Sequence, residues 1–222
     1  MKKVLLAFFG ELREFEQVIP YLKDLDKVDI IVSTWNTSSK GTEVNEELIK
    51  RLIPNVKQIH ITDSSIIPLS QITHQTNTNR LFYHWKTIIN NLENRNDYDN
   101  IIFHRCDLIS NWNTILDEVI EEDTIYLHTT DDLYATSKKH PTAHWCNDYY
   151  FYGDVAIVNK FINSFDYGSS DSHHAIFQVL HDNNIKYKTH ILKGILQKDL
   201  EFWLTGIDEF INTSQLPNID GW

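Results

Sequence analysis

Cysteine, glycine and proline are all scarce in this 222-residue sequence. The two cysteines, Cys106 and Cys146, form neither a C-x-x-C motif nor a disulfide framework, which makes a reducing compartment the default expectation. Seven glycines and five prolines exclude a collagen-like or linker-dominated chain. Long apolar runs are missing too, since none reaches the roughly 18 residues needed to cross a bilayer. We therefore expect a cytoplasmic protein without a transmembrane segment.

Basic residues are outnumbered, with 20 Lys and Arg against 31 Asp and Glu, a net charge of −11. Proteins that coat nucleic acid need a basic face for the phosphates, so this class is excluded. A small anionic ligand stays open, because a metal ion or a few local cations can hold one. With 41% hydrophobic and 12% aromatic residues, the chain can bury a sizeable core. Its length fits a single domain over residues 1–222.

Strand-like and helix-like segments alternate along the chain. Apolar runs predict strands at residues 4–9, 28–32, 56–61, 101–103, 124–127, 149–158 and 187–192. Apolar residues at helical spacing predict helices near residues 15–25, 46–53, 76–92, 112–120, 175–180 and 200–207. The polar residues 33–39 indicate a loop, and Thr76 or Asn77 is the expected cap of the longest helix. This order predicts an α/β fold with a mainly parallel sheet between helix layers.

Ligands of such sheets bind beyond the carboxyl ends of the strands, so the loops after strands are the first candidates for a site. Asp107 lies just past the strand at 101–103, and a carboxylate is a hard ligand suited to Mg²⁺ or Mn²⁺. Arg105 can bind a phosphate or can pair with Asp107. An ordinary loop ion pair between these two side chains explains their spacing equally well.

Two further segments place an arginine near the expected sheet edge. Gly10 ends the first strand and lets a ligand approach the backbone, while Arg13 falls in the next helical turn, where anions bind. A plain strand-to-helix turn is the simpler interpretation of this segment. Arg80 precedes the apolar stripe of the longest helix and can reach the sheet edge, although a solvated arginine beside a helix cap fits as well.

The second half of the chain is rich in acidic residues and histidine. Its candidates for chemistry are Asp131, Asp132, Asp148, Asp154, Asp171, His173, His174 and His190. Helix capping alone explains Asp171. The spacing of His104 and Asp107 is one residue too long for a non-haem iron triad, and no glutamate of a zincin helix accompanies the other histidines. Most of the histidines are expected at the surface or half-buried.

Four segments, taken in order, resemble signatures of small GT-A-type glycosyltransferases of lipopolysaccharide, capsule and viral glycan synthesis, including the WavE-type group. These segments are VLLAFFGELREF at 4–15, DIIVSTW at 29–35, NRLFYHWK at 79–86 and YDNIIFHRCDL at 98–108. They cover roughly the first half of the chain. The second half matches only loosely, through FYGD at 151–154.

The resemblance implies a GT-A-like, Rossmann-like fold and transfer of a sugar from a nucleotide-sugar to a glycan or other hydroxyl acceptor. It implies a donor-binding half at residues 1–110 and an acceptor-binding half at 111–222. The implied donor-binding residues are Gly10, Arg13, Thr34, Arg80 and Arg105. In such enzymes a D-x-D carboxylate binds Mn²⁺ or Mg²⁺ on the diphosphate. Asp107 matches the second Asp, Arg105 replaces the first and can itself neutralise phosphate charge, and His190 is the candidate histidine ligand.

An inverting enzyme of this kind also needs a carboxylate that accepts the proton of the acceptor hydroxyl. Asp148, Asp154 and Asp171 are the candidates. Two other functions stay open at this point. One is a nucleotidyltransferase on a related sheet, and the other is a non-catalytic glycan-binding or scaffolding subunit that has lost the D-x-D pair.

Overall fold

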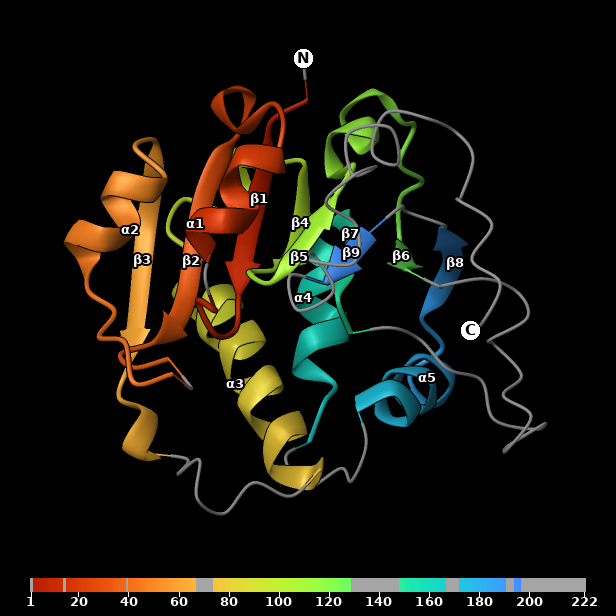
Figure 1. Cartoon of the computed structure of the whole chain (residues 1–222). Helices are drawn as coiled ribbons and strands as arrows, with labels where there is room; N and C mark the ends of the chain where they lie inside the picture. Colours follow the sequence, from red (N-terminus) through yellow and green to blue (C-terminus); the bar gives the residue numbers. More distant parts are fainter. Residues whose placement is uncertain are drawn as a thin grey trace, which may run out of the picture.

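A computed structural model describes residues 2–13, 15–38, 40–66, 74–128, 148–166, 172–190 and 194–196. A seven-stranded sheet runs through both halves of the chain in the order β3-β2-β1-β4-β7-β6-β8 (Figure 1). Its strands are β1 (Val4–Phe9), β2 (Asp29–Trp35), β3 (Val56–Thr62), β4 (Asn100–Arg105), β6 (Thr124–His128), β7 (Tyr150–Asp154) and β8 (Lys186–His190). Neighbouring strands are parallel except where β7 pairs with β4 and with β6. The predicted α/β fold with a mainly parallel sheet is confirmed.

Apolar side chains alternate along the central strands and form a layer on each face of the sheet. Leu6 and Phe8 of β1 face one layer, whereas Leu5 and Phe9 face the other. The first layer is covered by α1 (Phe15–Val18), α2 (Glu46–Leu52) and a 3-10 helix (Trp112–Asp117). The second is covered by α3 (His74–Asn91), α4 (Val155–Asn163) and α5 (Ser172–Asp182). A strand that is buried on both faces needs this continuous apolar sequence.

A second sheet has two strands, and the first of them follows β4 directly in the chain. It pairs β5 (Leu108–Ser110) with β9 (Gly194–Leu196) in antiparallel fashion. Neither strand is predicted from the sequence, because three residues are too few to show a period. Of the described helices, none is both long enough and apolar enough to pass through a bilayer.

The loop expected at residues 33–39 begins later, because β2 continues to Trp35 and only residues 36–38 of the described part lie outside it. Ser33, Thr34 and Trp35 continue β2, and all three are buried. All three pair with β3 in parallel, and Ser33 also pairs with Phe9 of β1. Their polarity therefore does not mark the end of the strand, because tertiary pairing outweighs local composition.

Other element boundaries also differ from the prediction. The segment 149–158 is not one strand, because Asp154 caps α4 by accepting a hydrogen bond from the backbone N–H of Ile157 at 2.8 Å. The helix expected at 112–120 is only the short 3-10 helix, and Val119 is 87% exposed. Helix α3 begins at His74, so a cap at Thr76 or Asn77 is wrong. The expected helix at 200–207 lies outside the described residues.

The helix expected over residues 15–25 is shorter and broken. The α-helical part ends at Val18, and a 3-10 turn follows over Ile19–Tyr21. Pro20 lies in this turn, where it lacks the N–H that a continuing α-helix would use. The apolar side chains at helical spacing still face the core, so the pattern predicts the buried face correctly but not the length of the helix.

Candidate functional site

The sheet has a switch point between β1 and β4. From β1 the chain proceeds to β2 and β3 on one side, whereas β4 lies on the other side of β1. The parallel register of β1 with β2 and with β4 brings their carboxyl ends to one edge (Figure 1). Ligands of open α/β sheets bind in the crevice beyond such a switch point. The loops after Phe9 and Arg105 are therefore the strongest candidates for a site.

These two loops are tied to each other and to β2. The backbone N–H of Cys106 donates to the carbonyl of Phe9, and that of Gly10 donates to the carbonyl of Ser33, both at 3.1 Å. Gly10 has a φ of +99°, a conformation that other residues adopt only with strain. A side chain at Gly10 would meet no atom within 4 Å. The turn thus needs glycine for its backbone and borders open space.

Five charged residues meet at this edge, and we call them the edge cluster: Glu11, Arg13, Arg105, Asp107 and Asp148. Arg105 binds Asp107 with a two-pronged fork, Nε to Oδ1 at 2.9 Å and Nη2 to Oδ2 at 2.7 Å. Its Nη1 contacts Asp148 Oδ1 at 3.4 Å. Arg13 reaches Asp107 Oδ2 at 3.8 Å and Glu11 Oε2 at 3.2 Å. The cluster joins residues from both halves of the chain.

Arg105 is held in position by the segment that precedes β7. Its backbone N–H donates to the carbonyl of Tyr149 at 3.0 Å, and its guanidinium lies 4.7 Å from the centre of the Tyr149 ring. Burial acts to lower the pKa of Arg105, but the charges of Asp107 and Asp148 outweigh burial and raise it. Arg105 therefore stays cationic and rigidly placed. The sequence gives no signal for Tyr149, because the contact joins residues far apart in the chain.

Arg80 reaches the neighbourhood of this edge from α3. Its guanidinium lies 4.1 Å from the centre of the Trp35 ring, and the residue is buried. Burial lowers the pKa of Arg80, while the nearby charge of Glu11 acts to raise it. The structure thus brings the expected donor-binding residues Arg13, Arg80 and Arg105 to one region. Thr34, the expected donor-binding residue on β2, has a fully buried side chain. Its Oγ1 has no hydrogen-bond partner among the described residues.

A buried histidine supports Trp35 and the end of β2. His84 Nδ1 is hydrogen-bonded to Ser33 Oγ at 2.9 Å, and the His84 ring meets the Trp35 ring edge-on at 4.4 Å between centres. Burial, assisted by the charge of Arg80, lowers the pKa of His84 to about 3. His84 is therefore neutral at ordinary pH. The sequence prediction missed this residue, because its position in the apolar helix gives no sign of a polar partner.

The stability of the protein should fall in mild acid because of His84. Below the unfolded-state pKa of about 6.5, the unfolded chain takes up a proton that the folded protein excludes down to about pH 3. Each pH unit in this window should remove up to about 1.4 kcal/mol from the free energy of unfolding. Urea unfolding at several pH values should give a flatter profile for His84→Asn than for wild type. A control, His181→Asn, changes an exposed histidine, and an equal flattening there would contradict the assignment.

His104 has a structural role next to Arg105 at the end of β4. Its Nδ1 donates to the carbonyl of Arg105 at 2.8 Å, since a carbonyl oxygen can only accept. Its Nε2 is bonded to Ser110 Oγ at 2.8 Å. Nε2 therefore links the end of β4 to β5, while Nδ1 bonds to the carbonyl of Arg105 within β4. His104 positions Arg105 and does not offer a nitrogen to a ligand.

The remaining predicted residues are not brought to the edge cluster. Asp154 pairs with Asn100 at the opposite end of β4, where it caps α4. His190 ends β8, which lies three strands away from β4 in the sheet order. At the usual strand spacing this separation is about 14 Å along the sheet. Asp171 lies outside the described residues, as do Asp131, Asp132 and Cys146.

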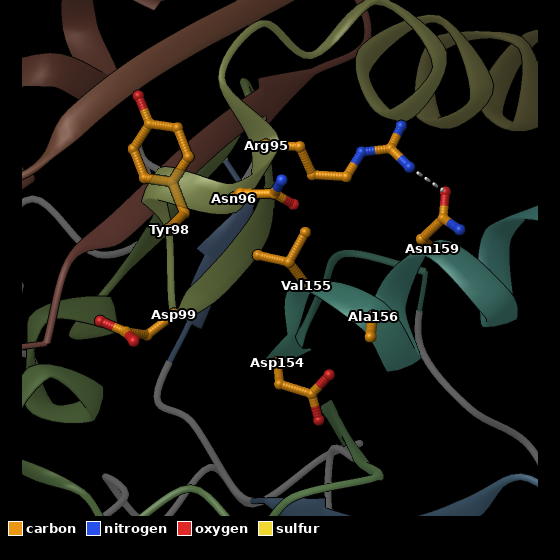
Figure 2. Close-up of a pocket in the computed structure, with 8 residues that line it drawn as sticks. All are labelled: Arg95, Asn96, Tyr98, Asp99, Asp154, Val155, Ala156 and Asn159. Atoms are coloured by element: carbon orange, nitrogen blue, oxygen red, sulfur yellow. Dashed lines mark hydrogen bonds between the residues drawn. The ribbon is translucent and has the colours of Figure 1, made fainter.

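A groove of about 480 Å³ lies at the opposite, amino edge of β4 (Figure 2). Two of the larger polar side chains in its lining, Arg95 and Tyr98, already bond within the protein. Arg95 donates to Asn159 Oδ1 at 3.1 Å and to the carbonyl of Ile89, and Tyr98 donates to Asp29 Oδ2 at 3.0 Å. Because these groups are satisfied and the groove is at the edge where such sheets seldom bind ligands, we favour the edge cluster as the site.

Comparison with known proteins adds no assignment. Neither a known protein family nor a curated protein sequence matches this chain significantly.

Proposed function

We propose that this protein is a nucleotide-sugar-dependent glycosyltransferase with a GT-A-like fold. One observation carries the proposal. Each of the four segments that resemble glycosyltransferase signatures supplies a side chain to the region around the same sheet edge. Arg13 comes from the first, Trp35 from the second, Arg80 from the third, and Arg105 with Asp107 from the fourth. Sequence motifs that are remote along the chain thus meet at the switch point, where a ligand is expected.

The chemistry of the edge cluster suits departure of a nucleoside diphosphate. As the sugar C1–O bond breaks, its electron pair stays on the diphosphate oxygen, and negative charge builds up there. Guanidinium groups aimed at that oxygen stabilise the transition state. In an inverting transfer, the acceptor oxygen bonds to C1 and its proton passes to a carboxylate. Asp148 is the predicted base that lies in the edge cluster, 3.4 Å from Arg105.

The residues at this edge do not suit the expected Mn²⁺ or Mg²⁺. Such cations prefer several oxygen ligands, as few cationic neighbours as possible, and room for water. Both oxygens of Asp107 accept hydrogen bonds from Arg105, and Arg13 approaches one of them as well. Within the described residues, no three His, Cys, Asp or Glu side chains are grouped so that they could hold a metal ion. The expectation of a divalent metal stays a prediction that metal-dependent binding would test.

Donor binding tests the proposal directly. Calorimetric titration with UDP-, GDP- and CMP-sugars, with and without Mn²⁺, should reveal one preferred nucleotide. Arg13→Ala and Arg80→Ala should each weaken that binding about 10- to 150-fold, because a hydrogen bond to a charged group is typically worth about 1.5–3 kcal/mol. Arg51→Ala on the exposed face of α2 is the matched control and should bind normally.

The result also separates the alternatives. Melting temperatures must stay near the wild-type value for the two site variants, so that lost affinity reports the site. Unchanged affinity in both variants would contradict a shared donor pocket. If no nucleotide-sugar binds with or without Mn²⁺, the non-catalytic scaffolding function is favoured instead.

A further inference from the structure

We propose that the edge cluster grips the donor diphosphate through guanidinium groups without a divalent metal, and that the diphosphate displaces Asp148 from Arg105. The identification of the anion as a donor diphosphate rests on the proposed function. The metal-free grip and the displacement rest on the contacts of Arg105.

The fork between Arg105 and Asp107 argues against a cation at Asp107. A metal ion bound there would lie beside a guanidinium whose Nε and Nη2 are 2.9 and 2.7 Å from the carboxylate oxygens. Arg13 adds a second positive charge at 3.8 Å. These two guanidinium groups neutralise the charge of Asp107 and approach its oxygens, so Asp107 has little left to offer a metal ion. A phosphate, in contrast, can take the place of a carboxylate on a guanidinium group.

Arg105 still has a second edge that can bind phosphate. Its guanidinium carries five N–H donors, and the fork to Asp107 uses one donor each from Nε and Nη2. The edge formed by Nη1 and Nη2 makes a single contact at 3.4 Å, to Asp148 Oδ1. A guanidinium edge matches two phosphate oxygens in the same planar geometry. The long, single contact to Asp148 is therefore the one that a diphosphate replaces, while the fork to Asp107 keeps Arg105 aligned.

The displacement connects donor binding to the chemical step. Once Arg105 binds the diphosphate, its ion pair with Asp148 is broken. The oxygen that faced Arg105 can then accept a hydrogen bond from the acceptor hydroxyl in its place. Asp148 would then accept the proton of the acceptor hydroxyl only when a donor is in place.

The direction in which Asp148→Asn changes diphosphate affinity distinguishes binding by guanidinium groups from a metal bridge. Asp148→Asn removes a carboxylate that competes for Arg105, so it should tighten diphosphate binding by about 3- to 10-fold, the range for one partly screened charge. A metal bridge that uses Asp148 predicts weaker binding instead. Turnover should fall in either case. The control is Glu46→Gln, which changes the net charge equally at a surface pair with Lys50 on α2 and should leave binding unchanged.

The experiment titrates the full chain, treated with EDTA and then with or without added Mn²⁺, against inorganic pyrophosphate, UDP and GDP. Metal-free binding that is tighter in Asp148→Asn supports the inference. Binding that requires Mn²⁺ overturns it and leaves the proposed function standing, and so does weaker binding by a folded Asp148→Asn. Metal-free pyrophosphate binding with no preference for a nucleotide supports the grip but contradicts the proposed function. Failure of every anion to bind overturns both. If Asp148→Asn does not fold, the wild-type titrations with and without Mn²⁺ still decide the metal question.

Discussion

Replacement of Arg105 by lysine should lower donor turnover by about 10²–10³-fold, the usual loss when one transition-state charge contact is removed. Lysine keeps the positive charge but has no planar fork, so it cannot bind Asp107 and a phosphate in the same plane. The measurement is the rate at which nucleoside diphosphate is released from the preferred donor. Arg95→Lys is the matched control, because Arg95 also bonds within the protein but lies at the opposite edge of β4 (Figure 2).

The comparison of Arg105→Lys with Asp107→Asn decides which group neutralises the diphosphate. If Arg105 does so, Asp107→Asn should have the smaller defect, since it only loosens the alignment of Arg105, and turnover should persist in EDTA. If a metal bridges Asp107 and the diphosphate, Asp107→Asn should have the larger defect and EDTA should abolish turnover. Lysine retains a cation beside Asp107 and Asp148, and asparagine is nearly isosteric with aspartate, so both variants are expected to fold. Full activity of Asp107→Asn in the presence of metal would discard the metal bridge.

Replacement of Trp85 by alanine should destabilise the protein by about 3–5 kcal/mol, as large-to-small changes at buried aromatic residues do. Trp85 of α3 is fully buried, and its ring contacts Phe9 of β1, Phe151 of β7 and Phe161 of α4. The cavity would therefore open between the sheet and two helices at once. Since domains are typically stable by only 5–15 kcal/mol, the variant should unfold at much lower urea concentration than wild type.

Trp85→Phe provides the control for that result. The indole Nε1 of Trp85 is buried and has no hydrogen-bond partner among the described residues. Phenylalanine removes this unsatisfied donor and keeps most of the aromatic contacts, so its loss of stability should be well below that of alanine. Equal losses for the two variants would show that the indole is not positioned as described.

The strands of the central sheet could be predicted from sequence because they are buried on both faces. Residues 4–9 and 101–103 are continuous apolar runs, and each falls within a strand of the structure. Where each helix or strand ends depends on tertiary contacts, which no local sequence pattern reveals. Ser33 stays in β2 because of the neighbouring strands and His84, and Asp154 turns the chain from β7 into α4 by capping it. Both positions were predicted wrongly, because a polar residue within an apolar segment can end a strand, cap a helix or bond to a buried partner.

The candidate site was predictable only in part, for a similar reason. The rule that ligands gather beyond the carboxyl ends of parallel strands led to Arg13, Arg105 and Asp107, and these side chains do approach one another. Which of the acidic residues of the second half joins them depends on the antiparallel direction of β7. That direction brings Asp148 to the edge cluster and carries Asp154 to the far edge. Sequence periodicity has no information about strand direction.

The pairing of β5 with β9 has a consequence for the time at which the site is completed during synthesis. Arg105 ends β4 and Asp107 lies in the turn between β4 and β5, and β5 finds its partner only at residues 194–196. Ribosomes add about 5–20 residues per second, so several seconds pass between the emergence of the two strands. During that interval β5 is an unpaired edge, a feature that invites pairing with other chains. A nascent chain that stalls before residue 194 would therefore expose an unpaired strand edge beside its candidate site.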